Sequence, residues 1–297
     1  MVLIHGISSN HHFWDLTEEH SLTAMLADSG FDAWTMDLRG HGDARFTEAG
    51  LRQRHGWSID DYGRYDLHAA ISHIQAVTGH EKIAIIGHSM GGMVAAAYNG
   101  HHGDDALSAL VVVGSPISFA STDLLRRLGP AGLSLGSLWQ SIGSQTFAKL
   151  SSRMPDALPL HGEGILYTAK NMAPRMRRFM LDRIASPVSR EELVHLKSIL
   201  KQQRFTSRDG TLDYESLLSG MDIPLLAIGG GGDKVVPIGA VAAWVGHVGS
   251  TDETFIEMSE SQGHAADYGH LDLVLGDVAR EEVLNPIVSW IETRLRP

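Results

Sequence analysis

The segment GHSMGG at 87–92 follows the apolar run 83–86 and precedes the small-residue run 93–98. A strand that turns sharply into a helix at this point presents the side chain of Ser89 at the tip of the turn, and the glycines around it leave room for the chain. The first amides of such a helix favour negative charge that develops beside them. The segment therefore predicts a nucleophilic serine at position 89.

Further apolar runs indicate the strands that flank this turn. They are VLIHG at 2–6, AWTMDLRG at 33–40, ALVVVGSP from 109, PLLAIGGGGD from 224 and ETFIEMS from 253. Most lack alternation, which suits parallel strands buried on both faces, whereas ETFIEMS alternates and is typical of a strand nearer the edge. Between strands, helical spacing begins at a cap formed by Ser58 with Asp61 and ends at Gly79. This order predicts an α/β fold, a mostly parallel sheet with helices on both faces.

The region 118–218 breaks the alternation of strands and helices. It carries helical patterns, scattered prolines and the segment MAPRMRRFM at 172–180. We interpret it as an inserted helical domain between two parts of the core, 1–117 and 219–297. Its methionines are expected to pack in the core rather than to contact a ligand, because methionine fills irregular core space readily.

The composition excludes several classes of protein. A formal net charge of -11 disfavours nucleic acid and anionic membranes as partners. The chain has no cysteine, which excludes disulfides, thiolate metal sites and a cysteine nucleophile. The start MVLIHGISSN has no basic leader, and no run reaches the roughly 18 apolar residues that span a bilayer. We therefore expect a cytoplasmic protein without a membrane span.

A serine nucleophile needs a base and a group that orients the base. Asp233 follows the strand that begins at Pro224, and sites in open α/β sheets gather at the carboxyl ends of strands. An aspartate that only stabilises its own turn is the alternative, while a phosphate loop is excluded because no Gly-Lys-Ser/Thr follows the glycines. For the base, position alone leaves both His264 and His270 open. The remaining histidines are not expected to bind a metal.

Two backbone amides must stabilise the oxyanion that forms when the serine attacks a carbonyl. One comes from the residue after the nucleophile, here Met90. The other comes from a loop after an earlier strand, and HGISSNHHFW at 5–14 supplies such a loop. We expect the amide of Ile7 to be this second donor, although the His-Gly pair could simply end the strand.

Together these motifs resemble the α/β-hydrolase superfamily over nearly the whole chain. They are, in order, LIHG, FDAWTMDLRGHG, GHSMGG, LLAIGGGGDKVVP and YGHLDLVLG. The order serine, aspartate, histidine is that of the family. WSIDDYGRYDLHAAI, GHSMGG and especially YGHLDLVLG are similar to the acid lipases and related bacterial esterases and lipases.

The resemblance implies that His270 is the base and that 118–218 forms a cap over an acyl pocket. A serine nucleophile argues against haloalkane dehalogenases and epoxide hydrolases, and against polyhydroxyalkanoate synthases. Family members usually have further residues before the His-Gly strand, which add two antiparallel edge strands, whereas here the first strand starts at Met1. An exposed sheet edge of this kind leaves a homodimer open as an option.

The expected function is hydrolysis of a small carboxylic ester through a Ser-His-Asp triad and an acyl-enzyme. Ser89 attacks, His270 moves the proton, Asp233 orients the imidazole, and no cofactor or metal takes part. An acyltransferase or a lactonase would use the same triad with another acceptor or a cyclic ester. A non-catalytic ligand-binding protein on the same fold is the alternative from another class, and such proteins usually lack triad members. The acyl chain length stays open.

Overall fold

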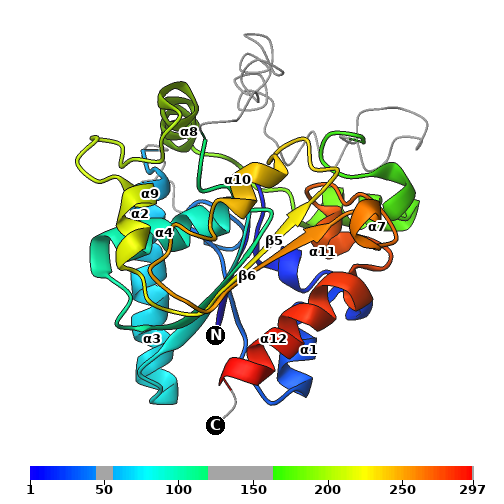
Figure 1. The fold of residues 1–297 in the computed structure, drawn as a ribbon, viewed down its shortest axis with the longest axis horizontal. Coiled ribbons are helices and arrows are strands. Elements are labelled where there is room, and N and C mark those ends of the chain that lie inside the picture. Colours follow the sequence, from blue (N-terminus) through cyan, green and yellow to red (C-terminus); the bar gives the residue numbers. More distant parts are fainter. Residues whose placement is uncertain (45–55, 120–162, 296–297) are drawn as a thin grey trace.

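The structure, a computed structural model, describes residues 1–44, 56–119 and 163–295. Its centre is a six-stranded sheet in the order β2-β1-β3-β4-β5-β6, with every neighbouring pair parallel (Figure 1). The strands are β1 (Val2–Ile4), β2 (Trp34–Met36), β3 (Ile83–His88), β4 (Leu107–Val113), β5 (Leu225–Gly230) and β6 (Glu253–Met258). The predicted fold class is confirmed, and β6 lies at an edge as its alternating sequence predicted.

Helices cover both faces of the sheet (Figure 1). They are α1 (Leu22–Asp28), α2 (Ile59–Asp61), α3 (His68–Thr78), α4 (Met90–His102), α7 (Pro174–Arg183), α8 (Arg190–Gln202), α9 (Tyr214–Leu217), α10 (Ile238–Ala242), α11 (Asp272–Leu275) and α12 (Asn285–Leu295). Successive strand residues point to opposite faces, so Ile85 packs in one hydrophobic cluster with α3 and α4, while Ile86 packs in the other with α1 and α12. Two apolar layers therefore hold the sheet between them.

The helix cap predicted at Ser58 and Asp61 is present in the structure. Ser58 and Asp61 form a capping box at the start of α2, in which the Asp61 carboxylate accepts from the Ser58 amide at 2.7 Å. A π-helical turn, Tyr62–Leu67, joins α2 to α3, and α3 ends at Gly79, whose φ of 76° is left-handed. The sequence pattern identified both ends but not the π-helical turn between them.

The described part of the predicted insertion packs against both faces of the core. Helix α7 buries Met176 and Met180 in the hydrophobic cluster shared with α12, which agrees with a packing role for these methionines. Helix α8 buries Leu200 in the opposite cluster. Residues 120–162 lie outside the described residues, so the boundaries 118–218 stay a prediction. In the described ranges no helix is both long and apolar enough to cross a membrane.

Candidate active site

Ser89 occupies the sharp turn between β3 and α4. Its φ of 54° and ψ of -119° lie in a region that non-glycine residues rarely adopt, at a cost of roughly 1–3 kcal/mol. Gly87 makes the turn feasible, because a Cβ there would lie 2.5 Å from the main chain of Gly91. The Ser89 amide donates to the Val113 carbonyl at 3.0 Å and thereby anchors the turn to β4. The sequence thus folds into the strand-turn-helix that its glycines predicted.

The structure brings His270 to the serine hydroxyl. His270 Nε2 lies 2.9 Å from Ser89 Oγ, and His270 Nδ1 lies 2.7 Å from Asp233 Oδ2. All three residues are buried, with exposed fractions of 7%, 4% and 8% for the serine, the histidine and the aspartate. A proton on Nδ1, donated to the carboxylate, leaves Nε2 free to accept from the serine. These contacts join the carboxyl ends of β3 and β5 to the loop before α11.

The loop after β5 fixes the orientation of the Asp233 carboxylate. Its Oδ1 accepts from the amides of Val235 and Val236, both at 2.8 Å, while Oδ2 faces His270. The side chain is fully shielded from solvent. Asp233 therefore does both things: Oδ1 stabilises its own turn, and Oδ2 contacts His270.

The second candidate base lies away from the serine. His264 is only partly buried, and its Nδ1 is 3.8 Å from Glu282 Oε2. Its amide donates to the Ser259 carbonyl at 3.1 Å in the turn after β6. The two histidines that sequence position could not separate therefore occupy different surroundings, and only His270 is placed beside Ser89.

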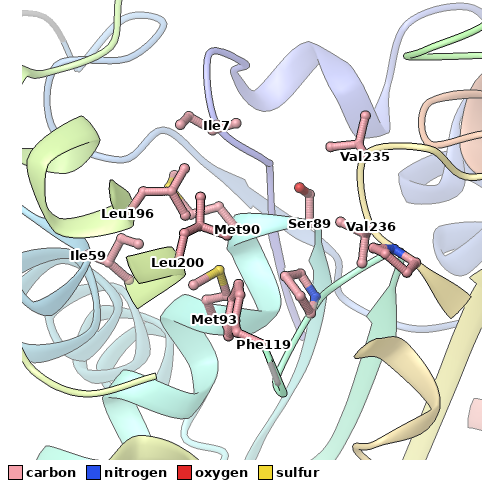
Figure 2. A pocket seen from close by; sticks show the side chains of 12 residues that line it. Ile7, Ile59, Ser89, Met90, Met93, Phe119, Leu196, Leu200, Val235 and Val236 are labelled. Atoms are coloured by element: carbon pink, nitrogen blue, oxygen red, sulfur yellow. The ribbon is translucent and has the colours of Figure 1, made fainter. Parts of the chain in front are cut away.

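Ile7 and Met90, the two predicted oxyanion donors, lie near the serine. Both line the same cavity as Ser89 (Figure 2). Met90 is the first residue of α4, and Ile7 lies in the loop after β1. Among the described residues, neither amide donates to a protein acceptor. Both amides are therefore available to a ligand atom bound beside Ser89.

The cavity beside Ser89 is apolar and has a volume of about 80 Å³, which is smaller than the roughly 300–1,000 Å³ of pockets that hold drug-sized ligands. Figure 2 shows Ser89 between Val235 and Val236 on one side and Leu196 and Leu200 of α8 on the other. The lining also includes Ile59, Met93, Pro116, Phe119 and Pro237. Helix α8 thus contributes apolar side chains to the wall that faces the serine.

His88 and Ser115, for which the sequence patterns predict no role, hold the main chain of His270 and Ser89. His88 Nε2 donates to the main-chain carbonyl of His270 at 3.0 Å. Burial lowers the pKa of His88 well below its ordinary value, so the ring is neutral. Ser115 Oγ donates to the Ser89 carbonyl at 2.6 Å. Only the position of His88 inside the serine motif could have pointed to it.

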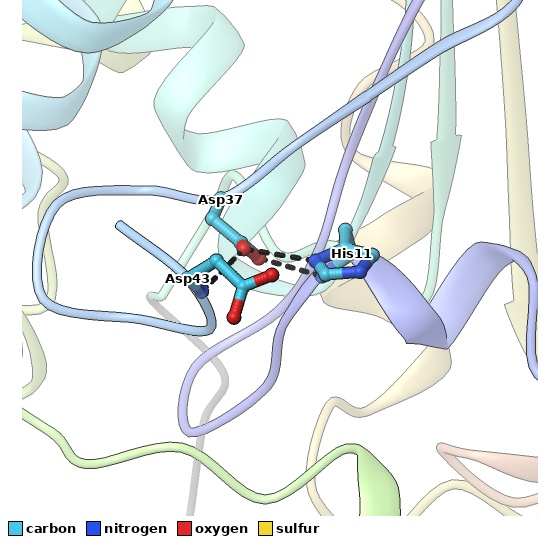
Figure 3. Close-up of side chains that lie close together, drawn as sticks. All are labelled: His11, Asp37 and Asp43. Atoms are coloured by element: carbon cyan, nitrogen blue, oxygen red, sulfur yellow. Dashed lines mark hydrogen bonds and ion pairs between the residues drawn. The ribbon is translucent and has the colours of Figure 1, made fainter. Parts of the chain in front are cut away.

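One group in the described ranges has the composition of a metal site. His11, Asp37 and Asp43 place candidate ligand atoms within 4.8 Å of one another. Both Asp37 oxygens, however, already accept hydrogen bonds of 2.8 Å, from the His11 amide and ring and from the Asp43 amide (Figure 3). The group therefore ties two loops together, and the expected absence of a metal stays a prediction.

The fold and the serine turn define an α/β-hydrolase. The family model described as alpha/beta hydrolase fold matches residues 1–277, and the chain belongs to this family. The chain is 23% identical to triacylglycerol lipase 1 of Arabidopsis thaliana over all of its own length and 80% of that protein. It is 36% identical to gastric triacylglycerol lipase of Rattus norvegicus, over 30% of this chain and 24% of that one.

Solved structures share the same architecture. A thermophilic esterase from Thermogutta terrifontis superposes with a TM-score of 0.67 at 18% identity, over 99% of this chain and 90% of that chain. The Paleococcus ferrophilus monoacylglycerol lipase gives a TM-score of 0.65 at 15% identity, over 99% of this chain and 93% of that chain. At these identities the likeness shows the fold, and the chemistry is argued from the site itself.

Proposed function

We propose that the protein hydrolyses carboxylic esters with apolar acyl groups through an acyl-enzyme on Ser89. The observation that carries the proposal is the series of hydrogen-bond contacts from Asp233 through His270 to Ser89, which lines the apolar cavity. The lipases among its sequence relatives support ester hydrolysis as the general class of reaction. A serine placed in this way has the base that its hydroxyl requires.

In the first step Ser89 Oγ forms a bond to the ester carbonyl carbon while His270 Nε2 takes the hydroxyl proton. The carbonyl oxygen becomes an oxyanion, and the amides of Ile7 and Met90 donate to it. The bond to the alcohol oxygen then breaks, and the alcohol leaves with the proton from His270. Asp233 stabilises the imidazolium throughout the step.

In the second step water attacks the acyl-enzyme. His270 takes a proton from the water as its oxygen bonds to the acyl carbon, and the oxyanion forms again. The bond to Ser89 Oγ breaks, the serine regains the proton, and the carboxylic acid leaves. The two steps consume one ester and one water and restore the enzyme.

The acyl group lies in the apolar cavity, and 118–218 forms the cap over it. This assignment is supported by Phe119, Leu196 and Leu200, which come from that region and line the cavity. The methionines of α7 take no part in the lining, which instead uses Met90 and Met93 of α4. An apolar wall favours uncharged acyl chains, because burying a charged group without a partner is costly.

A panel of p-nitrophenyl esters of rising chain length tests the proposal. The wild-type protein should release p-nitrophenol from the short and medium esters, and Ser89→Ala should lower turnover by about a millionfold while the fold stays intact. Near-normal rates in the purified variant would exclude the proposal. Added alcohol separates the alternatives, because an acyltransferase would make a new ester where a hydrolase makes the free acid.

A further inference from the structure

The loop that carries Ile7 adopts a strained conformation. Ser8, directly after Ile7, has a φ of 55°, which is uncommon for a residue other than glycine and costs free energy. A strained loop keeps one conformation only where surrounding contacts hold it. The amide of Ile7 therefore depends on whatever fixes Ser8 and the residues that follow.

The segment after α7 supplies many of these contacts. Ser8 Oγ donates to the Ser186 carbonyl at 2.8 Å, and the Ser186 amide donates to the Ser8 carbonyl at 2.9 Å. Asn10 Nδ2 donates to the carbonyls of Arg183 and Ile184, both at 2.9 Å. Asn10 is 4% exposed, so water cannot replace these bonds cheaply.

A second set of contacts joins the same loop to the residues after β2. Ser186 Oγ accepts from the Gly42 amide at 3.2 Å and from Asn10 Nδ2 at 3.3 Å. Asp37 accepts from the His11 amide at 2.8 Å (Figure 3). Burial by itself would raise the pKa of Asp37, but the hydrogen bonds it accepts from Asp43 and His11 hold this pKa below its ordinary value. The carboxylate thus stays charged and strengthens its bond to the loop.

We infer that Asn10 and Ser186 are positioning residues that hold the Ile7 amide in place for the oxyanion. The inference rests on the proposed function, since it assigns these two residues to the oxyanion site of that reaction. An oxyanion donor acts at about 2.7–3.1 Å from the developing charge, and loss of one donor costs about 10²–10³ in turnover. A displaced donor loses part of this factor, while substrate binding in the cavity beside Met90 is unaffected.

Asn10→Asp is the most selective perturbation. Its carboxylate keeps an oxygen to accept from the His12 amide, which the asparagine does at 3.0 Å, so the start of the following turn stays capped. The other oxygen replaces an NH2 group and faces two carbonyl oxygens, which repel it. The variant therefore breaks the contacts to Arg183 and Ile184 and leaves the local turn intact.

Asn99→Asp is the matched control. Asn99 in α4 is 8% exposed and donates to the Leu217 carbonyl at 3.3 Å, so the same change removes the same kind of bond. It lies nine residues beyond Met90 along α4, which puts it about 13 Å from the start of the helix. This control reports the cost in stability of a buried carboxylate without a change at the oxyanion loop.

The measurement compares kcat, KM and the inhibition constant of a trifluoromethyl ketone, whose adduct with serine carries an oxyanion. For Asn10→Asp we expect kcat to fall about 10- to 100-fold with KM within threefold, and inhibition to weaken by the same factor as kcat. Ser186→Ala, which keeps the main-chain pair with Ser8, should show a smaller change of the same kind. Asn99→Asp should keep kcat within threefold at a similar loss of thermal stability.

The inference is overturned if Asn10→Asp or, where that variant does not fold, Ser186→Ala keeps wild-type kcat and inhibition. It is also overturned if either variant changes kcat only as much as Asn99→Asp does. An inactive Ser89→Ala together with a fully active Asn10→Asp would remove this inference alone. An active Ser89→Ala would instead remove the proposed function on which it rests.

Discussion

Replacing Asp233 with asparagine should disable the base through its tautomer. The amides of Val235 and Val236 both point at Oδ1, so the asparagine oxygen takes that position and its NH2 group faces His270. An NH2 group only donates, so His270 Nδ1 must accept. The ring proton then lies on Nε2, which donates toward Ser89 and cannot take the serine proton.

The size of the effect follows from this geometry. A triad aspartate changed to asparagine elsewhere lowers turnover about 10⁴-fold through the same wrong tautomer, which corresponds to about 5 kcal/mol of transition-state stabilisation. Because asparagine is nearly isosteric and both valine amides keep their acceptor, the melting temperature of Asp233→Asn should stay within a few degrees of wild type. Steady-state hydrolysis of a p-nitrophenyl ester at pH 7.5 gives kcat, and calorimetry gives the melting temperature.

The tautomer mechanism is refuted if Asp233→Asn keeps kcat within tenfold of wild type in a folded protein. Such a result would mean that the 2.7 Å contact between Asp233 Oδ2 and His270 Nδ1 does not govern the protonation of the ring. A large loss of stability with the loss of activity would instead trace the effect to the loop after β5.

Three further outcomes are expected. His270→Ala should match Ser89→Ala in severity, whereas His264→Ala should lower turnover less than about tenfold; the reverse order would assign the base to His264. Burial raises the pKa of Glu192 from 4.5 to about 7, so its proton stays bound only in the folded state between these values. The free energy of unfolding, measured by urea titration, should therefore fall as pH rises through that window. In Glu192→Gln this fall should be smaller by up to about 3 kcal/mol. The prediction is contradicted if wild type and Glu192→Gln lose stability equally with rising pH. Leu200→Trp, in the cavity wall, should slow hydrolysis of long acyl esters more than of acetate esters, and an unchanged ratio of rates would place the acyl group elsewhere.

The sequence predicted the sheet and the places of Ser89 and Asp233 because each of these signals is local, whereas His270 was preferred to His264 through the family resemblance. Strand runs are compact, and the glycines that permit the serine turn adjoin it. Parallel strands then bring their carboxyl ends to one edge, so residues far apart in sequence meet without any further signal. The order of the strands places the ends of β3 and β5 close enough for one histidine to contact both.

The hydrogen bonds that hold the loop of Ile7 could not be predicted in this way. Asn10 and Ile184 are separated by 174 positions, and although Asn10 lies in the segment HGISSNHHFW, no pattern in the sequence pairs it with Ile184. Their contact depends on the route of the chain after α7, which hydrophobic spacing alone does not specify. The burial of the Glu192 carboxyl could not be predicted either, because in the sequence Glu192 is simply the N3 residue of a capping box with Ser189.

Mass spectrometry of the trapped acyl-enzyme tests the assignment of Ser89 as the nucleophile. The protein is mixed with a p-nitrophenyl ester, quenched in acid during the initial burst, digested and mapped. This assignment predicts one added acyl group, located on Ser89 in the peptide that contains GHSMGG, and none in Ser89→Ala. An acyl group on another residue, or a Ser89→Ala protein that still acylates and turns over, would contradict it.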